Sequence, residues 1–142
     1  MAIATRTLKD TKLESGSGAQ GGKVTVIANM NDNTTADSVI LDASWLSGHA
    51  NGAKLDITRI WWGLVQGTAD DNTGWASIEF VGSSTDTLAI DLAGTGHYDG
   101  TAGKIENNAT NTSATSGDLK LNAYGVSGFV LIELRKDEAF TA

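Results

Sequence analysis

The chain has 142 residues, of which 40% are hydrophobic, and its 17 acidic and 10 basic residues give a net charge of −7 at pH 7. It contains no cysteine and no proline, which excludes disulfide scaffolds, cysteine-based zinc sites and thiol enzymes. The length fits one domain, and no apolar run approaches the roughly 20 residues that a membrane-spanning helix needs.

The first 22 residues differ in composition from the rest of the chain. A weak strand from Ile3 to Leu8 is followed by the Gly/Ser-rich residues 14–22. Because Gly/Ser-rich segments behave as flexible linkers, we expect residues 1–22 to form an extended N-terminal arm and residues 23–142 to form one β-sandwich domain. Such an arm can add a strand to the sheet of a neighbouring subunit.

Period-two alternation dominates the remainder of the chain. In residues 23–30, the apolar side chains of Val24, Val26, Ala28 and Met30 fall on one face, as in a half-buried strand. Similar patterns predict further strands at residues 38–46, 54–66, 75–81, 85–92, 118–124 and 128–136. The last of these contains the apolar run Phe129–Ile132, which predicts a central strand covered on both faces.

Turn-forming clusters of Gly, Asn, Asp and Ser separate these segments. About seven to eight strands at this spacing predict an all-β fold, either a single antiparallel β-sandwich or a partly closed barrel. Gly94 to Gly117 contains almost no large apolar residue, so we expect it to be a long exposed loop.

Four tryptophans are unusual in a chain with so few aromatic residues. The adjacent Trp61 and Trp62 must point to opposite faces of a regular strand, so we expect one in the core and the other at an interface. With Arg6 and Leu8 of the arm, Trp61 and Trp62 are the candidate partner-binding residues. In an alternative hypothesis, the tryptophans form a platform on which a carbohydrate stacks.

The sequence lacks recognisable catalytic motifs. His49 and His97 lie in turn-like segments without metal-ligand spacing. Gly100–Lys104 resembles the end of a phosphate-binding loop, but Tyr98 stands where that motif needs glycine and Ile105 where it needs Ser or Thr.

Acidic loops at residues 29–33 and 70–72 offer oxygen ligands, and a weak calcium site stays open there, although Thr34 replaces the glycine of an EF-hand. The sequence therefore predicts no catalytic residue, no cofactor and no established metal site, and hence a protein that is not an enzyme.

Charge disfavours nucleic acid and anionic membrane surfaces as partners. The basic residues are scattered along the sequence, and the net charge of −7 repels polyanions.

The overall character resembles that of a small structural protein of a tailed-bacteriophage virion, closest to the capsid decoration, or cement, type. The resemblance rests on the arm Met1–Gly22, the loop Gly94–Gly117, the terminal strand Gly128–Lys136, the acidic charge and the lack of cysteine. The resemblance is one of general character over the whole chain. It includes no diagnostic motif, so it assigns a function to no individual residue. The lack of proline departs from decoration proteins that have proline-rich arms.

The resemblance implies a non-enzymatic protein that binds the outer surface of a phage capsid and stabilises it by bridging capsid subunits. Its partners would be the major capsid protein and further copies of itself, as a trimer or dimer. It would be made in the host cytoplasm and reside on the virion. A head–tail or tail component is the alternative within the virion, and a carbohydrate-binding module is the alternative from another class.

Overall fold

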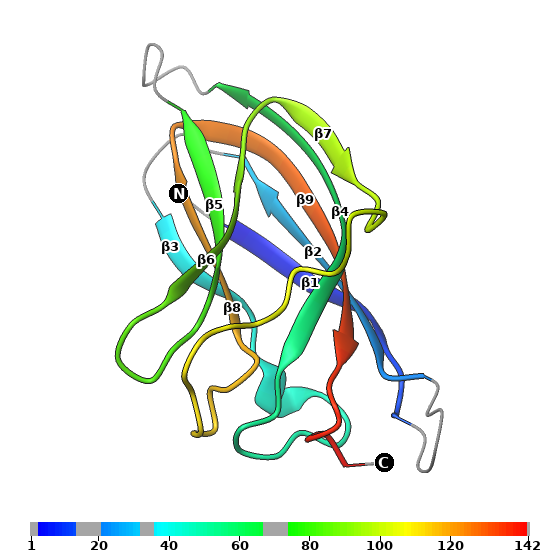
Figure 1. The fold of residues 1–142 in the computed structure, drawn as a ribbon. Coiled ribbons are helices and arrows are strands. Elements are labelled where there is room, and N and C mark those ends of the chain that lie inside the picture. The colour runs from blue at the N-terminus through cyan, green and yellow to red at the C-terminus, as the bar shows by residue number, and fades with distance from the viewer. Residues whose placement is uncertain (1–2, 14–20, 32–35, 67–73, 142) are drawn as a thin grey trace.

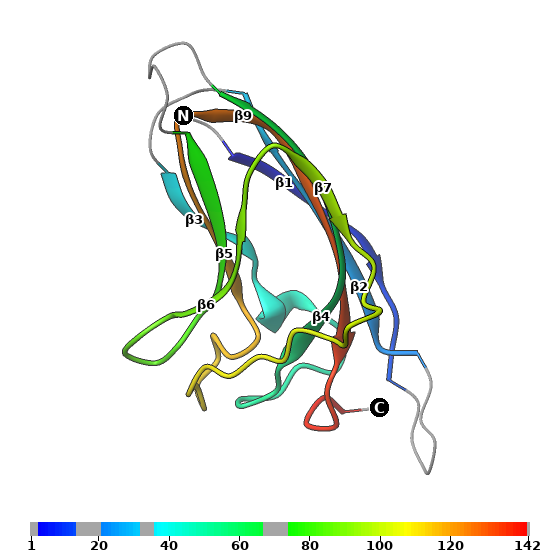
Figure 2. The same ribbon diagram turned by 45° about the horizontal axis from the view of Figure 1, so that its top comes forward.

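Two antiparallel sheets pack face to face in the computed structural model, which describes residues 3–13, 21–31, 36–66 and 74–141 (Figure 1). The turned view in Figure 2 shows the two sheets as separate layers. This arrangement confirms the predicted antiparallel β-sandwich, and the sheets do not close into a barrel.

The larger sheet has five strands in the order β1-β2-β9-β4-β7, and the smaller has four in the order β3-β8-β5-β6. The larger sheet consists of β1 (Ile3–Asp10), β2 (Lys23–Met30), β9 (Val126–Lys136), β4 (Leu55–Gln66) and β7 (Thr95–Tyr98). The smaller sheet consists of β3 (Ala36–Leu41), β8 (Leu119–Tyr124), β5 (Trp75–Phe80) and β6 (Thr87–Leu92). A short 3-10 turn, η1 (Ala43–Trp45), follows β3.

The core lies between the sheets and follows the predicted alternation. Val24 and Val26 of β2 face inward from the larger sheet, and Ile78 and Phe80 of β5 face inward from the smaller one. All four side chains are almost completely buried. Burial of such side chains contributes about 1.5–3 kcal/mol each, so the inner faces hold the two sheets together.

The first strand corrects the expectation of a free arm. β1 pairs with β2 from Ile3↔Met30 to Asp10↔Val24 and is the edge strand of the larger sheet. Its far end is held by the buried Lys136, whose ammonium donates to the Asp10 carboxylate at 2.5 Å and to the Thr11 carbonyl at 2.8 Å. The boundary expected after residue 22 would therefore separate β1 from β2, which are neighbours in one sheet. Residues 14–20 of the expected linker lie outside the described residues.

The segment Gly94–Gly117 also differs from the expected exposed loop. It begins with β7, which raises the strand count in the described part of the chain to nine. Beyond β7, Ile105 exchanges backbone hydrogen bonds with Ile57, and Ala109 is buried. The buried Asn111 donates to the carbonyl of Val81 at 3.0 Å. Asparagine amides replace the missing apolar side chains here, because a buried polar group is tolerated when it is hydrogen-bonded.

Local irregularities explain the remaining differences from the expected strands. A register shift between Val39 and Leu41 buries both Ile40 and Leu41, and the chain then leaves the sheet for η1. The strand β9 is central, as predicted, but it is covered on its inner face only, with Phe129 of the other face 38% exposed. The uncovered side of the larger sheet is therefore the surface that needs a functional explanation.

Candidate functional site

The side of the five-stranded sheet that faces away from the core, here called the outer face, carries an ordered arrangement of side chains. The strand register places Arg6, Ile27, Leu131, Trp61 and His97 in one row across all five strands. Neighbouring side chains in such a row are in contact distance of one another. We call the middle of this row, Ile27, Leu131 and Trp61, the apolar row.

His97 covers one end of the apolar row. Its ring is stacked on the indole of Trp61, with ring centroids 4.9 Å apart and an angle of 8° between the planes. The sequence indicated a loop for His97, whereas the structure places it on β7, paired with Trp61. Ile27, Leu131 and Trp61 are each half-buried, and Val65 nearby on β4 is 67% exposed. The outer face thus presents an apolar strip to solvent.

Trp62 lies on the opposite side of the same strand, as strand alternation predicts. It packs against the core, and its indole N–H donates to the carbonyl of Ala93 at 3.0 Å. Gly96 makes room for it, because a Cβ at that position would lie 2.2 Å from the indole. Of the two adjacent tryptophans, Trp61 is therefore the interface candidate and Trp62 belongs to the structural framework.

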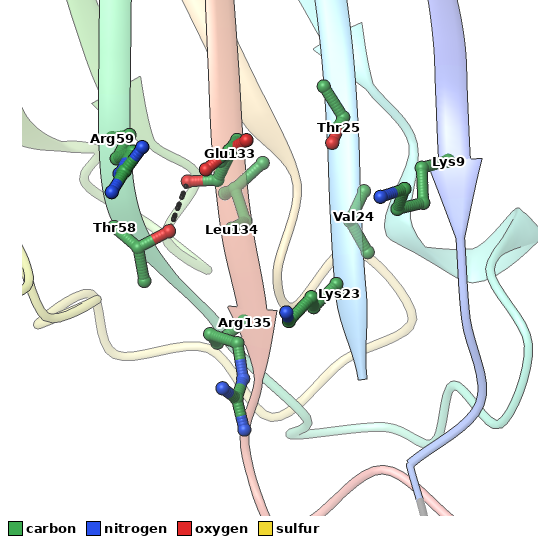
Figure 3. A pocket seen from close by; sticks show the side chains of 9 residues that line it. All are labelled: Lys9, Lys23, Val24, Thr25, Thr58, Arg59, Glu133, Leu134 and Arg135. Carbon is green, nitrogen blue, oxygen red and sulfur yellow. Dashed lines mark hydrogen bonds between the residues drawn. The ribbon is translucent and has the colours of Figure 1, made fainter. Parts of the chain in front are cut away.

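Beside the apolar row lies a depression of about 380 Å³ lined by basic side chains, which we call the cationic depression (Figure 3). Its charged lining comes from four different strands: Lys9 of β1, Lys23 of β2, Arg59 of β4, and Arg135 with Glu133 of β9. Four of the ten basic residues of an acidic chain thus gather around a single carboxylate.

In the part of the chain that the structure describes, the side chains of these four cations lack protein partners, whereas most of the other lysines have them. Lys104 and Lys120 form ion pairs of 2.9 Å with Asp56 and Asp86, and Lys54 donates to the carbonyl of Ala109. Within the described residues, none of the four cations of the depression forms an ion pair or a side-chain hydrogen bond. Unpaired charges of one sign are available to a partner of the opposite sign.

The two candidate residues of the expected arm lie on this same face. Arg6 of β1 is the first residue of the row that continues through Ile27. Leu8, which is 53% exposed, lies at the register shift of β1. Arg6 and Leu8 line a shallow hollow together with Ile27 and Asn29. The structure therefore brings Arg6, Leu8 and Trp61 onto one surface and leaves Trp62 on the other side of the sheet.

The outward side of the four-stranded sheet has the opposite charge. We call it the acidic face: Asp37, Glu79 and Asp91 project from its strands and Asp86 lies just before β6, with Lys120 as the basic residue among them. Burial, and then the neighbouring carboxylates of Asp37 and Asp86, raise the pKa of Glu79. The two outer faces of the sandwich therefore carry charges of opposite sign.

The other candidate residues named from the sequence make contacts within the protein and do not form a site. The Nε2 atom of His49 lies 2.9 Å from the carbonyl oxygen of Ser116, and its ring meets Phe140 edge-on. In the described part of the chain, no three His, Cys, Asp or Glu side chains come together in a way that could hold a metal ion. The expected acidic loops fall largely on residues 32–35 and 67–73, outside the described residues. No helix among the described segments has the length and apolarity to cross a bilayer.

No protein-family model, no curated protein and no solved structure matches this chain. Sequence reasoning missed Lys9, Lys23, Arg59, Arg135 and Glu133. Alternation places Lys23, Arg59, Glu133 and Arg135 on the outward side of their strands, whereas Lys9 reaches that side through the register shift between Thr7 and Lys9. Their proximity depends on β9 lying between β2 and β4, a pairing that joins segments far apart in the chain.

Proposed function

We propose that this chain is a non-enzymatic structural protein that attaches to a larger protein assembly through the outer face of its five-stranded sheet, in the manner of a capsid decoration protein. The partner is an acidic protein surface, with the major capsid protein of a tailed phage as its first candidate. The charge and the resemblance noted from the sequence support the virion as the setting.

The observation that carries this proposal is the pairing of an apolar row with unpaired cations on one accessible face. An apolar strip supplies the contact area, while unpaired charges at its border orient the partner and speed its association. Glu133 lies among the cations, so a complementary partner needs a positive charge opposite Glu133 as well as negative charges opposite the cations. A protein surface carries charges of both signs.

The test is co-sedimentation of the protein with purified phage heads. We expect the double variant Lys9→Glu/Arg59→Glu to pellet at least tenfold less than the wild type, because both exposed cations are reversed. Since β1 is an integral strand, point substitutions test this face better than removal of the N-terminal residues. A control with the same direction of charge change, Lys12→Glu, reverses an exposed lysine that does not line the depression, and it keeps binding.

Equal binding of the Lys9→Glu/Arg59→Glu variant and the wild type would refute the proposed attachment face. Binding to tails or connectors instead of heads would move the protein to the alternative virion role.

One observation favours carbohydrate binding as a second candidate function. Trp45 of η1 is 82% exposed and lines a groove of about 460 Å³ with Thr5, Thr7 and Asp42. An indole beside hydroxyl and carboxylate groups suits a sugar, which stacks one face and hydrogen-bonds at its edges. A change in tryptophan fluorescence on adding glycans, lost in Trp45→Ala, would favour this function.

A further inference from the structure

The chain itself carries a surface with the chemistry that the cationic depression requires. On the acidic face, one cross-strand row runs from Asp37 through Asn122 and Ser77 to Asp91, and the next row contains Glu79 and Lys120. Four carboxylates surround one lysine there, whereas four cations surround one carboxylate in the depression. The acidic face thus offers the carboxylates that the unpaired cations of the depression lack.

Apolar side chains border the charges on both faces. Beside the carboxylates of the acidic face, Val39 is 46% and Leu88 is 55% exposed. Trp75, which is 42% exposed, stacks with Tyr124 at a centroid distance of 6.4 Å. Exposed apolar groups next to charges are typical of contact surfaces between proteins.

The smaller of the two faces limits the contact area. The four strands of the acidic face have six residues each, so they are roughly 20 Å long and, lying about 4.8 Å apart, present on the order of 400 Å². A contact over this face would bury about 800 Å² in total, the size of a weak, concentration-dependent interface.

The charges decide the mode of contact. Two copies that meet through the same cationic face would bring eight cations against two carboxylates, and like charges at contact are strongly unfavourable. A symmetric dimer that brings the two depressions together is therefore unfavourable. The complementary arrangement places the cationic face of one copy on the acidic face of the next, a head-to-tail contact that continues as a chain or closes as a ring.

We infer that copies of this protein associate head to tail, the outer face of the five-stranded sheet of one copy on the acidic face of the next. This inference rests on the proposed function, because both use the outer face of the five-stranded sheet as a contact surface. In an open oligomer, the last copy keeps its cationic face free for the larger assembly. The net charge of −7 repels the copies at long range, so the contact forms through the local charges once the faces are close.

Two double variants test the inference, each with one face reversed. Lys9→Glu/Arg59→Glu reverses the ends of a row on the outer face, and Asp37→Lys/Asp91→Lys reverses the ends of a row on the acidic face. All four side chains are exposed, so the fold tolerates the changes. Sedimentation velocity at rising protein concentration, in low and high salt, gives the mass of each sample.

We expect the wild-type mass to rise above 14.7 kDa with concentration and to fall back in high salt. Each double variant alone stays a monomer, because it has lost one of the two faces. An equimolar mixture of the two variants associates, because the intact outer face of one variant fits the intact acidic face of the other and the two reversed faces are complementary as well. The quadruple variant, which exchanges the signs of both faces and keeps the net charge, regains association.

A monomeric wild type at all concentrations would overturn the inference, as would a mixture that stays monomeric or single variants that associate like the wild type. These outcomes are separable from the proposed function. Asp37→Lys/Asp91→Lys leaves the outer face intact and keeps binding to phage heads whether or not copies associate with each other.

Discussion

At the scale of single residues, Asp118 shows how burial of a carboxyl group links stability to pH. Its side chain is buried and accepts a hydrogen bond from the backbone N–H of Ala43 at 2.8 Å. Burial, followed by the nearby carboxylate of Asp42, raises the pKa of Asp118 from 3.8 to about 6. Because the folded state holds this proton more tightly than the unfolded chain does, the contribution of Asp118 to stability falls as pH rises from about 4 to 6.

This sign predicts the behaviour of Asp118→Asn. The amide keeps the oxygen that accepts from Ala43 and carries no charge, so the variant should match the wild type near pH 4 and exceed its free energy of unfolding near pH 7.5. Urea denaturation across this range measures the difference, with Asp91→Asn as a control for the loss of one exposed negative charge. A constant difference between Asp118→Asn and the wild type at all pH values would contradict the assignment.

At the scale of the elements, alternation in the sequence was sufficient to find most strands and their buried faces. Val24 to Met30 and Leu119 to Ala123 bury the side chains that their patterns indicate, because a half-buried strand leaves a local signal. The order of strands left no such signal. That β9 lies between β2 and β4, and that Lys136 holds the end of β1 to their sheet, depends on contacts between residues about 60 to 126 positions apart in the chain.

Lys136 is the clearest of these non-local contacts, and it supports a prediction about β1. Its ammonium is fully buried and donates to the Asp10 carboxylate and to the carbonyls of Thr11 and Ser47. Lys136→Met would leave three acceptors without a donor, and loss of one partner from a buried pair costs about 3–5 kcal/mol. Asp10 is 24% exposed, which favours the lower end of this range.

Chemical denaturation of Lys136→Met should show this loss of stability. In hydrogen exchange, the substitution should speed the exchange of the β1 amides that bond β2 more than that of the β5 amides. The matched control is Lys120→Met, which breaks the more exposed pair with Asp86 and should cost less than about 1 kcal/mol. Equal losses in Lys136→Met and Lys120→Met would show that Lys136 does not anchor the edge strand.

At the scale of the whole molecule, the fold separates charge between its two outer faces, so basic residues that are scattered in the sequence form one patch. Along the chain they are spread from Arg6 to Lys136, yet four of them meet in one depression. A basic patch raises the question of nucleic acid as an alternative partner. Two features oppose it: Glu133 lies among the cations, and the net charge of −7 repels a polyanion beyond the contact distance.

We therefore predict that the protein does not bind a 30-base-pair DNA duplex at 150 mM salt with a dissociation constant below about 100 μM, the weak end of non-specific binding. Fluorescence anisotropy of a labelled duplex measures this directly. The Glu133→Gln variant, which removes the opposing carboxylate, provides the sensitive comparison, because it should bind the duplex more tightly than the wild type at low salt. Micromolar binding by the wild type, lost in Lys9→Glu/Arg59→Glu, would instead assign the outer face to nucleic acid, and the proposed attachment to an acidic protein surface would fall with it.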